Sequence, residues 1–197
     1  MATITTLPKA FPSRYDVPVI AHVDLSIFYK QYFTDCMACS FCADSCCSHG
    51  VDVDLYHVQR LLERGDALEA YTGIAREDWF VRDRIQDPEL PGGGSVRTQV
   101  AGGACVFLDR RDRGCMIHKF CDEFGTDYHE LKSIVDCLFP LSVTDGTLYP
   151  ASEVEDGTLA CVGTGPTLYR GLRGELQYYF GEELVQVLDA MEMSGEP

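Results

Sequence analysis

The chain has 197 residues, with 31 Asp or Glu against 16 Lys or Arg, which gives a formal net charge of −15 at pH 7. Such an acidic excess would repel a phosphate backbone, because nucleic-acid binding depends on Lys and Arg displacing counterions; we expect no nucleic-acid partner. The sequence has no run of about 20 apolar residues that could span a membrane. It also shows no secretory leader pattern, so we expect a cytoplasmic protein whose thiols stay reduced.

The N-terminal stretch is the first predicted feature along the chain. Three prolines in residues 1–19 oppose helix formation, so we interpret this stretch as an N-terminal arm in extended or turn conformation. The rest, 20–197, is predicted to be a single metal-cluster domain. The Pro- and Gly-rich segment 88–95 is a candidate hinge inside it.

Helical spacing of apolar residues dominates the rest of the chain, with fewer alternating stretches. The predicted fold class is therefore α+β: a single irregular, mostly helical domain with a small antiparallel sheet, organised around a cysteine-ligated metal centre. The predicted strands are a pair around Gly102 and Gly103 and the stretch 147–154. The predicted helices are, in chain order, 24–33, 55–64, 76–85, 126–135, 167–180 and 182–191.

Cysteine is the strongest chemical signal in the sequence. Five of the ten cysteines fall within twelve residues, in the pattern C-x2-C-x2-C-x3-C-C. Two intervening residues let a turn direct successive thiolates at one small inorganic core, and iron–sulfur clusters and zinc prefer thiolate ligands. Buried structural thiols or a disulfide knot would explain five clustered cysteines less well. The members of this run are Cys36, Cys39, Cys42, Cys46 and Cys47.

A second group of candidate ligands follows a polar turn. Cys105, Cys115, His118 and Cys121 could form a closed Cys3His zinc site by themselves. Alternatively, Cys105 and Cys115 fold back to complete a site shared with the first run, and His118 is only hydrogen-bonded nearby. The sequence leaves both arrangements open.

Several of these motifs together resemble a known family. CADSCCSHGVDVD, the C-x-F-L at Cys105, the C-x-I at Cys115 and the C-x-x-P at Cys137 resemble the YkgJ-type cysteine-cluster superfamily, described as zinc- or iron-chelating. That superfamily includes flagellin lysine N-methylase, which is similar to iron–sulfur enzymes. The resemblance covers roughly residues 33–192 and is strongest to a bacterial branch. It implies a cofactor held by Cys39, Cys42, Cys46, Cys47, Cys105, Cys115 and Cys137, with Cys36 as an alternative to Cys39, and it leaves His118, Cys121 and Cys161 outside the shared core.

The number of cysteines guides the functional prediction. Seven ligands exceed what one zinc ion uses, so we expect a [4Fe–4S] cluster or another polynuclear iron centre with a redox or group-transfer role. If the protein is an enzyme, an iron–sulfur-dependent oxidoreductase or a methyltransferase-like enzyme is the expected type. The alternative is a Zn²⁺-binding structural or metal-handling module, for storage, delivery or sensing, without catalysis.

Partners and acid–base groups complete the sequence-based hypotheses. The acidic surface would suit a basic redox partner or substrate protein. Asp52, Asp54 and His49 directly follow the cysteine run and are the candidates for catalytic residues beside a metal. Either aspartate could instead cap the helix that follows.

Overall fold

The computed structural model describes residues 3–195, and their contacts divide the chain into two compact units. The terminal unit joins the chain up to Asp35 to the chain from Leu138 onward, and the cysteine-rich unit is Cys36–Cys137. Helices make up 39% and strands 27% of the structure. The α+β class is therefore confirmed, but a mostly helical fold is not supported. The domain boundary expected near residue 20 stays a prediction.

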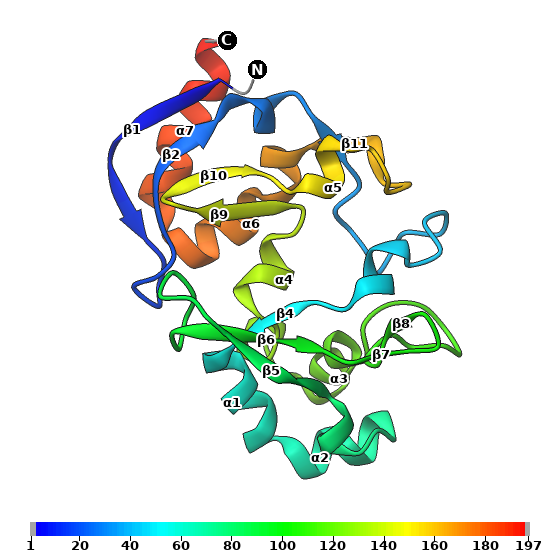
Figure 1. Cartoon of the computed structure of the whole chain (residues 1–197). Coiled ribbons are helices and arrows are strands. Elements are labelled where there is room, and N and C mark those ends of the chain that lie inside the picture. The colour runs from blue at the N-terminus through cyan, green and yellow to red at the C-terminus, as the bar shows by residue number, and fades with distance from the viewer. Residues whose placement is uncertain (1–2, 196–197) are drawn as a thin grey trace. The chain divides into compact units, whose positions relative to one another are not determined.

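The terminal unit contains a four-stranded sheet in the order β1-β2-β10-β9 (Figure 1). The segment expected to be an arm supplies β1, which pairs antiparallel with β2, so its extended conformation is stabilised by a ladder of hydrogen bonds. Strand β10 runs parallel to β2 and antiparallel to β9. A separate two-stranded sheet pairs β3 with β11. These strands are β1 Ile4–Pro12, β2 Val19–Asp24, β3 Gln31–Tyr32, β9 Leu141–Thr144, β10 Thr147–Pro150 and β11 Val162–Thr167.

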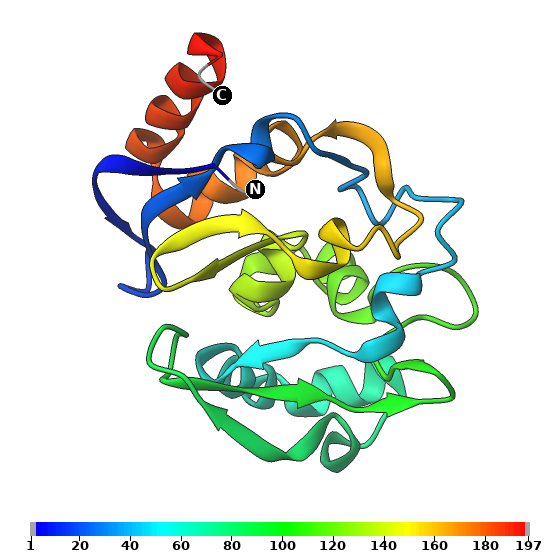
Figure 2. The same cartoon turned by 45° about the horizontal axis from the view of Figure 1, so that its top comes forward.

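Two C-terminal helices complete the terminal unit and confirm the predicted pair. They are α6, Leu168–Phe180, and α7, Glu182–Ser194. The Thr167 side chain caps α6 by accepting a hydrogen bond from a backbone N–H of the first turn. Gly181 ends the helix at φ +87°, a conformation that favours glycine. Figure 2 shows both helices on one side of the four-stranded sheet, and α5, Ser152–Glu155, lies in the connection after β10.

A charged network joins α6 to α7 and gives a pH-dependent prediction. Asp189 accepts hydrogen bonds from Arg173 Nη2 at 2.7 Å and from the Tyr169 hydroxyl at 2.7 Å. Mainly because Arg173 binds the charged form, the pKa of Asp189 falls from 3.8 to about 2. This stabilisation is present above pH 3.8 and is lost as the pH falls through 2. We expect Asp189→Asn to cost about 1–2 kcal/mol of unfolding free energy near pH 7.

Urea unfolding of the wild type and Asp189→Asn at several pH values checks this prediction. The difference in unfolding free energy between the two proteins should shrink as the pH falls from 4 toward 2, because the wild-type carboxylate then becomes protonated. A difference that is constant over this range would show that the charge of Asp189 is not what stabilises the helix pair.

The cysteine-rich unit is built on a three-stranded antiparallel sheet in the order β4-β6-β5 (Figure 1). Its hydrophobic core gathers apolar side chains of the sheet and of the packed helices, with Leu61, Leu68 and Trp79 fully buried. The expected hinge, 88–95, lies inside this unit, in the turn between β5 and β6. The elements are β4 Asp52–Asp54, β5 Phe80–Gln86, β6 Gly94–Thr98, α1 Leu55–Glu63, α2 Gly65–Thr72 and α3 Met116–Phe124.

Helix α1 and the glycine hairpin confirm two local predictions in this unit. The Asp54 side chain caps α1, as the sequence suggested for Asp54 or Asp52. Gly102 and Gly103, both with positive φ, connect β7, Val100–Ala101, to β8, Ala104–Cys105. The hairpin brings Cys105 to the end of a short antiparallel ladder.

Three helix predictions are wrong or incomplete. Residues 76–85 form a short 3-10 turn, Arg76–Asp78, followed by β5, because Trp79 is buried in the core and the next residues pair with β6. Residues 24–33 form only a 3-10 turn, Leu25–Phe28, before β3 pairs with β11. In 126–135 a 3-10 turn, Tyr128–Glu130, precedes α4, Ile134–Leu138. Sheet pairing and burial override the local helical spacing in the first two cases.

None of the helices within residues 3–195 has the length and apolar character that a membrane span requires.

Candidate metal centre

The cysteine run, residues 36–47, follows a series of turns rather than one helix. Its last part is a 3-10 turn, Ser45–His49, which we call η2. Two successive non-glycine residues, Ala43 and Asp44, have φ of +49° and +55°. Cys47 N–H donates to the Asp44 carbonyl at 2.9 Å, which closes the turn behind them. The bends let thiols from both ends of the run approach one another.

Thiols within the run come close together in pairs. Cys36 and Cys46 are hydrogen-bonded through their side chains, and this bond raises the pKa of Cys36. The Sγ atoms of Cys46 and Cys47 are 4.0 Å apart, and those of Cys39 and Cys42 lie within 4.8 Å of each other. Cys36 is exposed, whereas Cys39 and Cys42 are buried. One end of the thiol group therefore faces solvent and the other is enclosed.

The hairpin and the polar turn bring two further cysteines to the run. Strand β8, which carries Cys105, packs against η2. Cys115 forms a β-bridge with Leu108 and, like Cys47, packs against the core cluster that contains Cys105. Burial raises the pKa of Cys105, and it raises the pKa of Cys115 to about 11. Both are thus protonated thiols near neutral pH, and binding a metal would have to displace their protons.

A largely buried lysine precedes Cys137 in the chain and interacts electrostatically with thiols of the unit. Lys132 Nζ is 3.1 Å from Asp136 Oδ2, and the Lys132 side chain is only 14% exposed. Burial alone would lower the pKa of Lys132, but Asp136 and the thiols of Cys115 and Cys137 raise it well above its ordinary value. Lys132 and Asp136 also act electrostatically on Cys36. The Lys132–Asp136 pair therefore acts electrostatically on thiols of the run, of the polar turn and of the Cys137 segment.

Charged residues near the thiols are not among the residues predicted for the site. Lys132 lies in the predicted helix 126–135 and Asp136 directly follows it, whereas Asp44 and Arg113 are each two residues from a cysteine. The sequence signal that could have identified them is a charged residue close to a cysteine. Because the chain has 31 acidic residues, such a neighbour does not by itself indicate a contact with a thiol.

His118 and Cys121 occupy different surroundings from those of the thiol group. The His118 ring stacks on Tyr128 at 4.6 Å between centroids, and its Nε2 is 3.8 Å from Asp122 Oδ2. Cys121 is fully buried in the hydrophobic core, where burial raises its pKa to about 11. Of the residues that the structure describes, no three ligand atoms drawn from Cys105, Cys115, His118 and Cys121 lie within 4.8 Å of one another. By this measure the described part of the cysteine-rich unit preassembles neither this Cys3His set nor any other set of three thiols of the same unit.

Asp54 is buried, and both of its carboxylate oxygens accept hydrogen bonds. His57 Nδ1 lies 2.8 Å from both Asp54 carboxylate oxygens, and the Ser133 hydroxyl donates to Oδ2 at 2.8 Å. Ser133 Oγ also accepts from Val135 N–H at 3.2 Å, at the start of the α4 region that carries Cys137. Asp54 therefore anchors this segment to β4, which is a positioning role.

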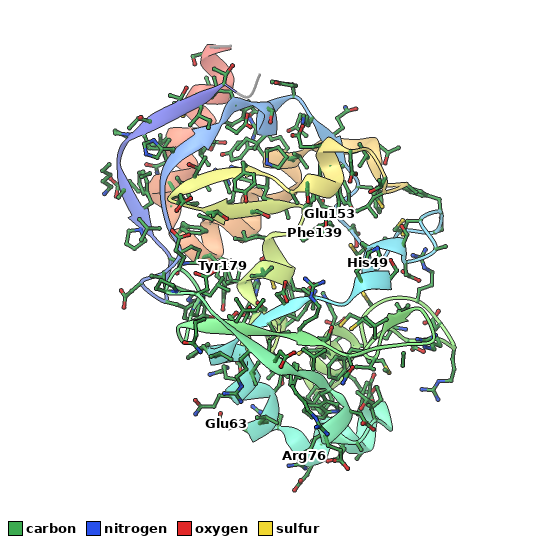
Figure 3. All side chains as sticks on the ribbon, in the orientation of Figure 1. His49, Glu63, Arg76, Phe139, Glu153 and Tyr179 are labelled. Atoms are coloured by element: carbon green, nitrogen blue, oxygen red, sulfur yellow. The ribbon has the colours of Figure 1, made fainter. Side chains whose placement is uncertain are left out.

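The other two acid–base candidates lie at the surface. Asp52 pairs across β4 and β6 with Arg97, whose Nε is 3.0 Å from Asp52 Oδ1. His49, labelled in Figure 3, is exposed at the end of η2, and its carbonyl accepts a hydrogen bond from Arg97 Nη1 at 3.4 Å. Their position next to the run agrees with their place in the sequence, and whether any of the three candidates has a chemical role stays a prediction.

Cys161 belongs to the terminal unit, where it is buried. Its carbonyl accepts hydrogen bonds from Phe33 N–H at 3.1 Å and from the Thr164 hydroxyl at 2.9 Å. These contacts hold the start of β11 against the chain beside β3.

Comparison of the chain with protein-family models, with curated proteins and with solved structures finds no match.

The donor set fits a thiophilic metal. Every cysteine lies within residues 3–195 and carries a thiol, and nine of the ten belong to the cysteine-rich unit. Thiolates are the ligands that zinc and iron–sulfur clusters share. This unit thus contains a group of cysteines that could hold a metal ion, and the geometry of the thiols alone does not define which metal.

Proposed function

We propose that the protein binds an iron–sulfur cluster, with [4Fe–4S] as the first choice, or another polynuclear iron centre. The observation that carries the proposal is the gathering of thiols from separate segments of one unit. The first run supplies five, β8 and the polar turn supply Cys105 and Cys115, and the α4 region supplies Cys137. A single zinc ion takes four ligands, so this supply suits a centre with several metal ions better.

The proposed cofactor ligands are the seven cysteines implied by the resemblance to YkgJ-type proteins, with Cys36 as an additional candidate. Cys36 is the exposed member, and its hydrogen bond with Cys46 keeps it beside the others. A centre held in this way would have buried ligands on one side and access from solvent on the other. That arrangement supports a redox or group-transfer role, either as an oxidoreductase or as a methyltransferase-like enzyme.

The residues around the thiols would supply the surroundings that such a centre needs. The Lys132–Asp136 pair places a cation among sulfurs that become negative when they bind metal. The core cluster keeps water away from Cys105 and Cys115. We place the protein in the cytoplasm, where thiols stay reduced, and its acidic surface would favour a basic redox partner or substrate protein. A bound iron–sulfur cluster would supply electron transfer or activation of a substrate.

Anaerobic purification, followed by iron, sulfide and zinc analysis and an EPR spectrum, tests the proposal. We expect iron and acid-labile sulfide in similar amounts, a broad brown absorption and an EPR signal on reduction or oxidation. Stoichiometric zinc without iron, in protein reconstituted with iron and sulfide, would overturn the iron assignment. That result would instead support a zinc-binding structural or metal-handling module.

A further inference from the structure

One charged side chain outside the predicted ligand set contacts the cysteine run directly. Arg113 Nη2 lies 3.4 Å from Cys42 Sγ and 2.7 Å from Asp44 Oδ1. Arg113 belongs to the polar turn that precedes Cys115. A guanidinium has five N–H donors in a rigid fork, so it can serve a carboxylate and sulfur atoms at the same time.

Solvent is partly excluded from this contact. The Arg113 side chain is 29% exposed, that of Asp44 is 17% exposed, and Cys42 is buried. Hydrogen bonds in which a partner is charged are stronger than neutral ones, more so where water is scarce. When Cys42 becomes a thiolate on binding metal, the N–H donor of Arg113 would face a full negative charge.

The backbone that directly follows Cys42 has an unusual conformation. Ala43 and Asp44 both have positive φ in the left-handed region, which is unfavourable for alanine and more readily adopted by aspartate. Asp44 lies in the turn that separates Cys42 from Cys46, and its carboxylate accepts a hydrogen bond from Arg113. Unfavourable backbone held in place by an ion pair is typical of sites where geometry serves a ligand.

From these contacts we infer that Arg113, held by Asp44, is a positioning residue of the metal centre: it keeps Cys42 in place and donates an N–H···S hydrogen bond to it. The inference rests on the proposed function only in that the thiols bind metal. For an iron–sulfur centre, hydrogen bonds to ligand sulfur stabilise the more negative, reduced state and raise the reduction potential.

Metal titration of the apo-protein tests the inference without relying on iron. Co²⁺ added anaerobically to the wild type, Arg113→Gln and Arg113→Lys gives a thiolate charge-transfer absorption whose rise reports affinity. We expect Arg113→Gln to bind Co²⁺ about 10–100-fold more weakly, the usual cost of losing a partner of a ligand. Arg113→Lys keeps the positive charge but loses the forked donors, so its Co²⁺ affinity should lie between those of the wild type and Arg113→Gln.

Arg111→Gln is the matched control, because it removes the same charge from the same turn. The Arg111 side chain is 86% exposed, and its nearest acidic partner is Asp109 at 3.9 Å. We expect Co²⁺ affinity within about twofold of the wild type. Affinity of Arg113→Gln equal to that of Arg111→Gln would overturn the inference.

A second readout separates positioning of the centre from general support of the fold. In iron-loaded protein, the reduction potential of Arg113→Gln should be more negative than that of the wild type, whereas Arg111→Gln should leave it unchanged. An unchanged potential in the loaded Arg113→Gln protein would contradict the hydrogen bond to sulfur. If circular dichroism shows that Arg113→Gln does not fold, the Arg113→Lys variant is measured in its place. A Co²⁺ affinity and a reduction potential equal to those of the wild type would overturn the inference, and lower values of both would support it. Wild-type protein that binds Co²⁺ with this dependence on Arg113 but never binds iron would refute the iron proposal alone.

Discussion

Cys46→Ser should lose metal and much of the stability of the cysteine-rich unit. The Cys46 thiol is hydrogen-bonded to Cys36, and its Sγ lies 4.0 Å from that of Cys47, so Cys46 lies between two other proposed ligands. Replacing a thiolate by a hydroxyl removes a soft ligand from the centre. We expect the loss of metal affinity to exceed the 10–100-fold that is typical of changes outside the ligand set. Because metal binding contributes to folding, the midpoint of thermal unfolding of the metal-loaded protein should fall as well.

Metal analysis and thermal unfolding of Cys46→Ser beside Cys121→Ala check this prediction. Cys121 is a fully buried cysteine of the same unit, surrounded by apolar side chains. Its replacement should lower stability by leaving a small cavity but should preserve the metal content. Full metal content in Cys46→Ser would remove Cys46 from the ligand set. Loss of metal in Cys121→Ala would extend the centre into the hydrophobic core.

Asp54→Ala should destabilise the protein by about 3–5 kcal/mol, because Asp54 holds a buried hydrogen-bond network. The change removes the cap of α1 and leaves the His57 ring and the Ser133 hydroxyl without their carboxylate partner in a buried position. It also releases the link between β4 and the segment that carries Cys137. Urea unfolding of the metal-free protein measures the expected loss directly.

Asp52→Ala is the matched control on the same strand. Asp52 faces Arg97 in an ion pair whose side chains are 29% and 48% exposed, so its loss should cost no more than about 1 kcal/mol. Equal destabilisation by the two changes would contradict the structural role assigned to Asp54. A variant of Asp52 that is stable and metal-loaded but lacks an activity found in the wild type would support the acid–base hypothesis for Asp52.

Local signals were sufficient for some elements and failed for others. Helix α1 and the pair α6 and α7 were predictable, because caps at Asp54 and Thr167 and a break at Gly181 act within one turn of the chain. Strand β5 was mistaken for a helix because its character depends on pairing with β6 and on the burial of Trp79. Neither the pairing with β6 nor the burial of Trp79 can be deduced from residues 76–85 alone.

The sequence by itself determined the kind of chemistry: the spacing of five cysteines within twelve residues indicates metal, because nearby thiolates can be directed at one core by the turns between them. Only the tertiary structure decided which distant groups join them. Packing of β8 against η2 brings Cys105 to the run, and Cys115 and Cys47 pack against the same hydrophobic cluster. Lys132 and Arg113 became recognisable because folding excludes water around them and brings their charges to the sulfurs. Charge acquires such a specific effect only where solvent no longer screens it.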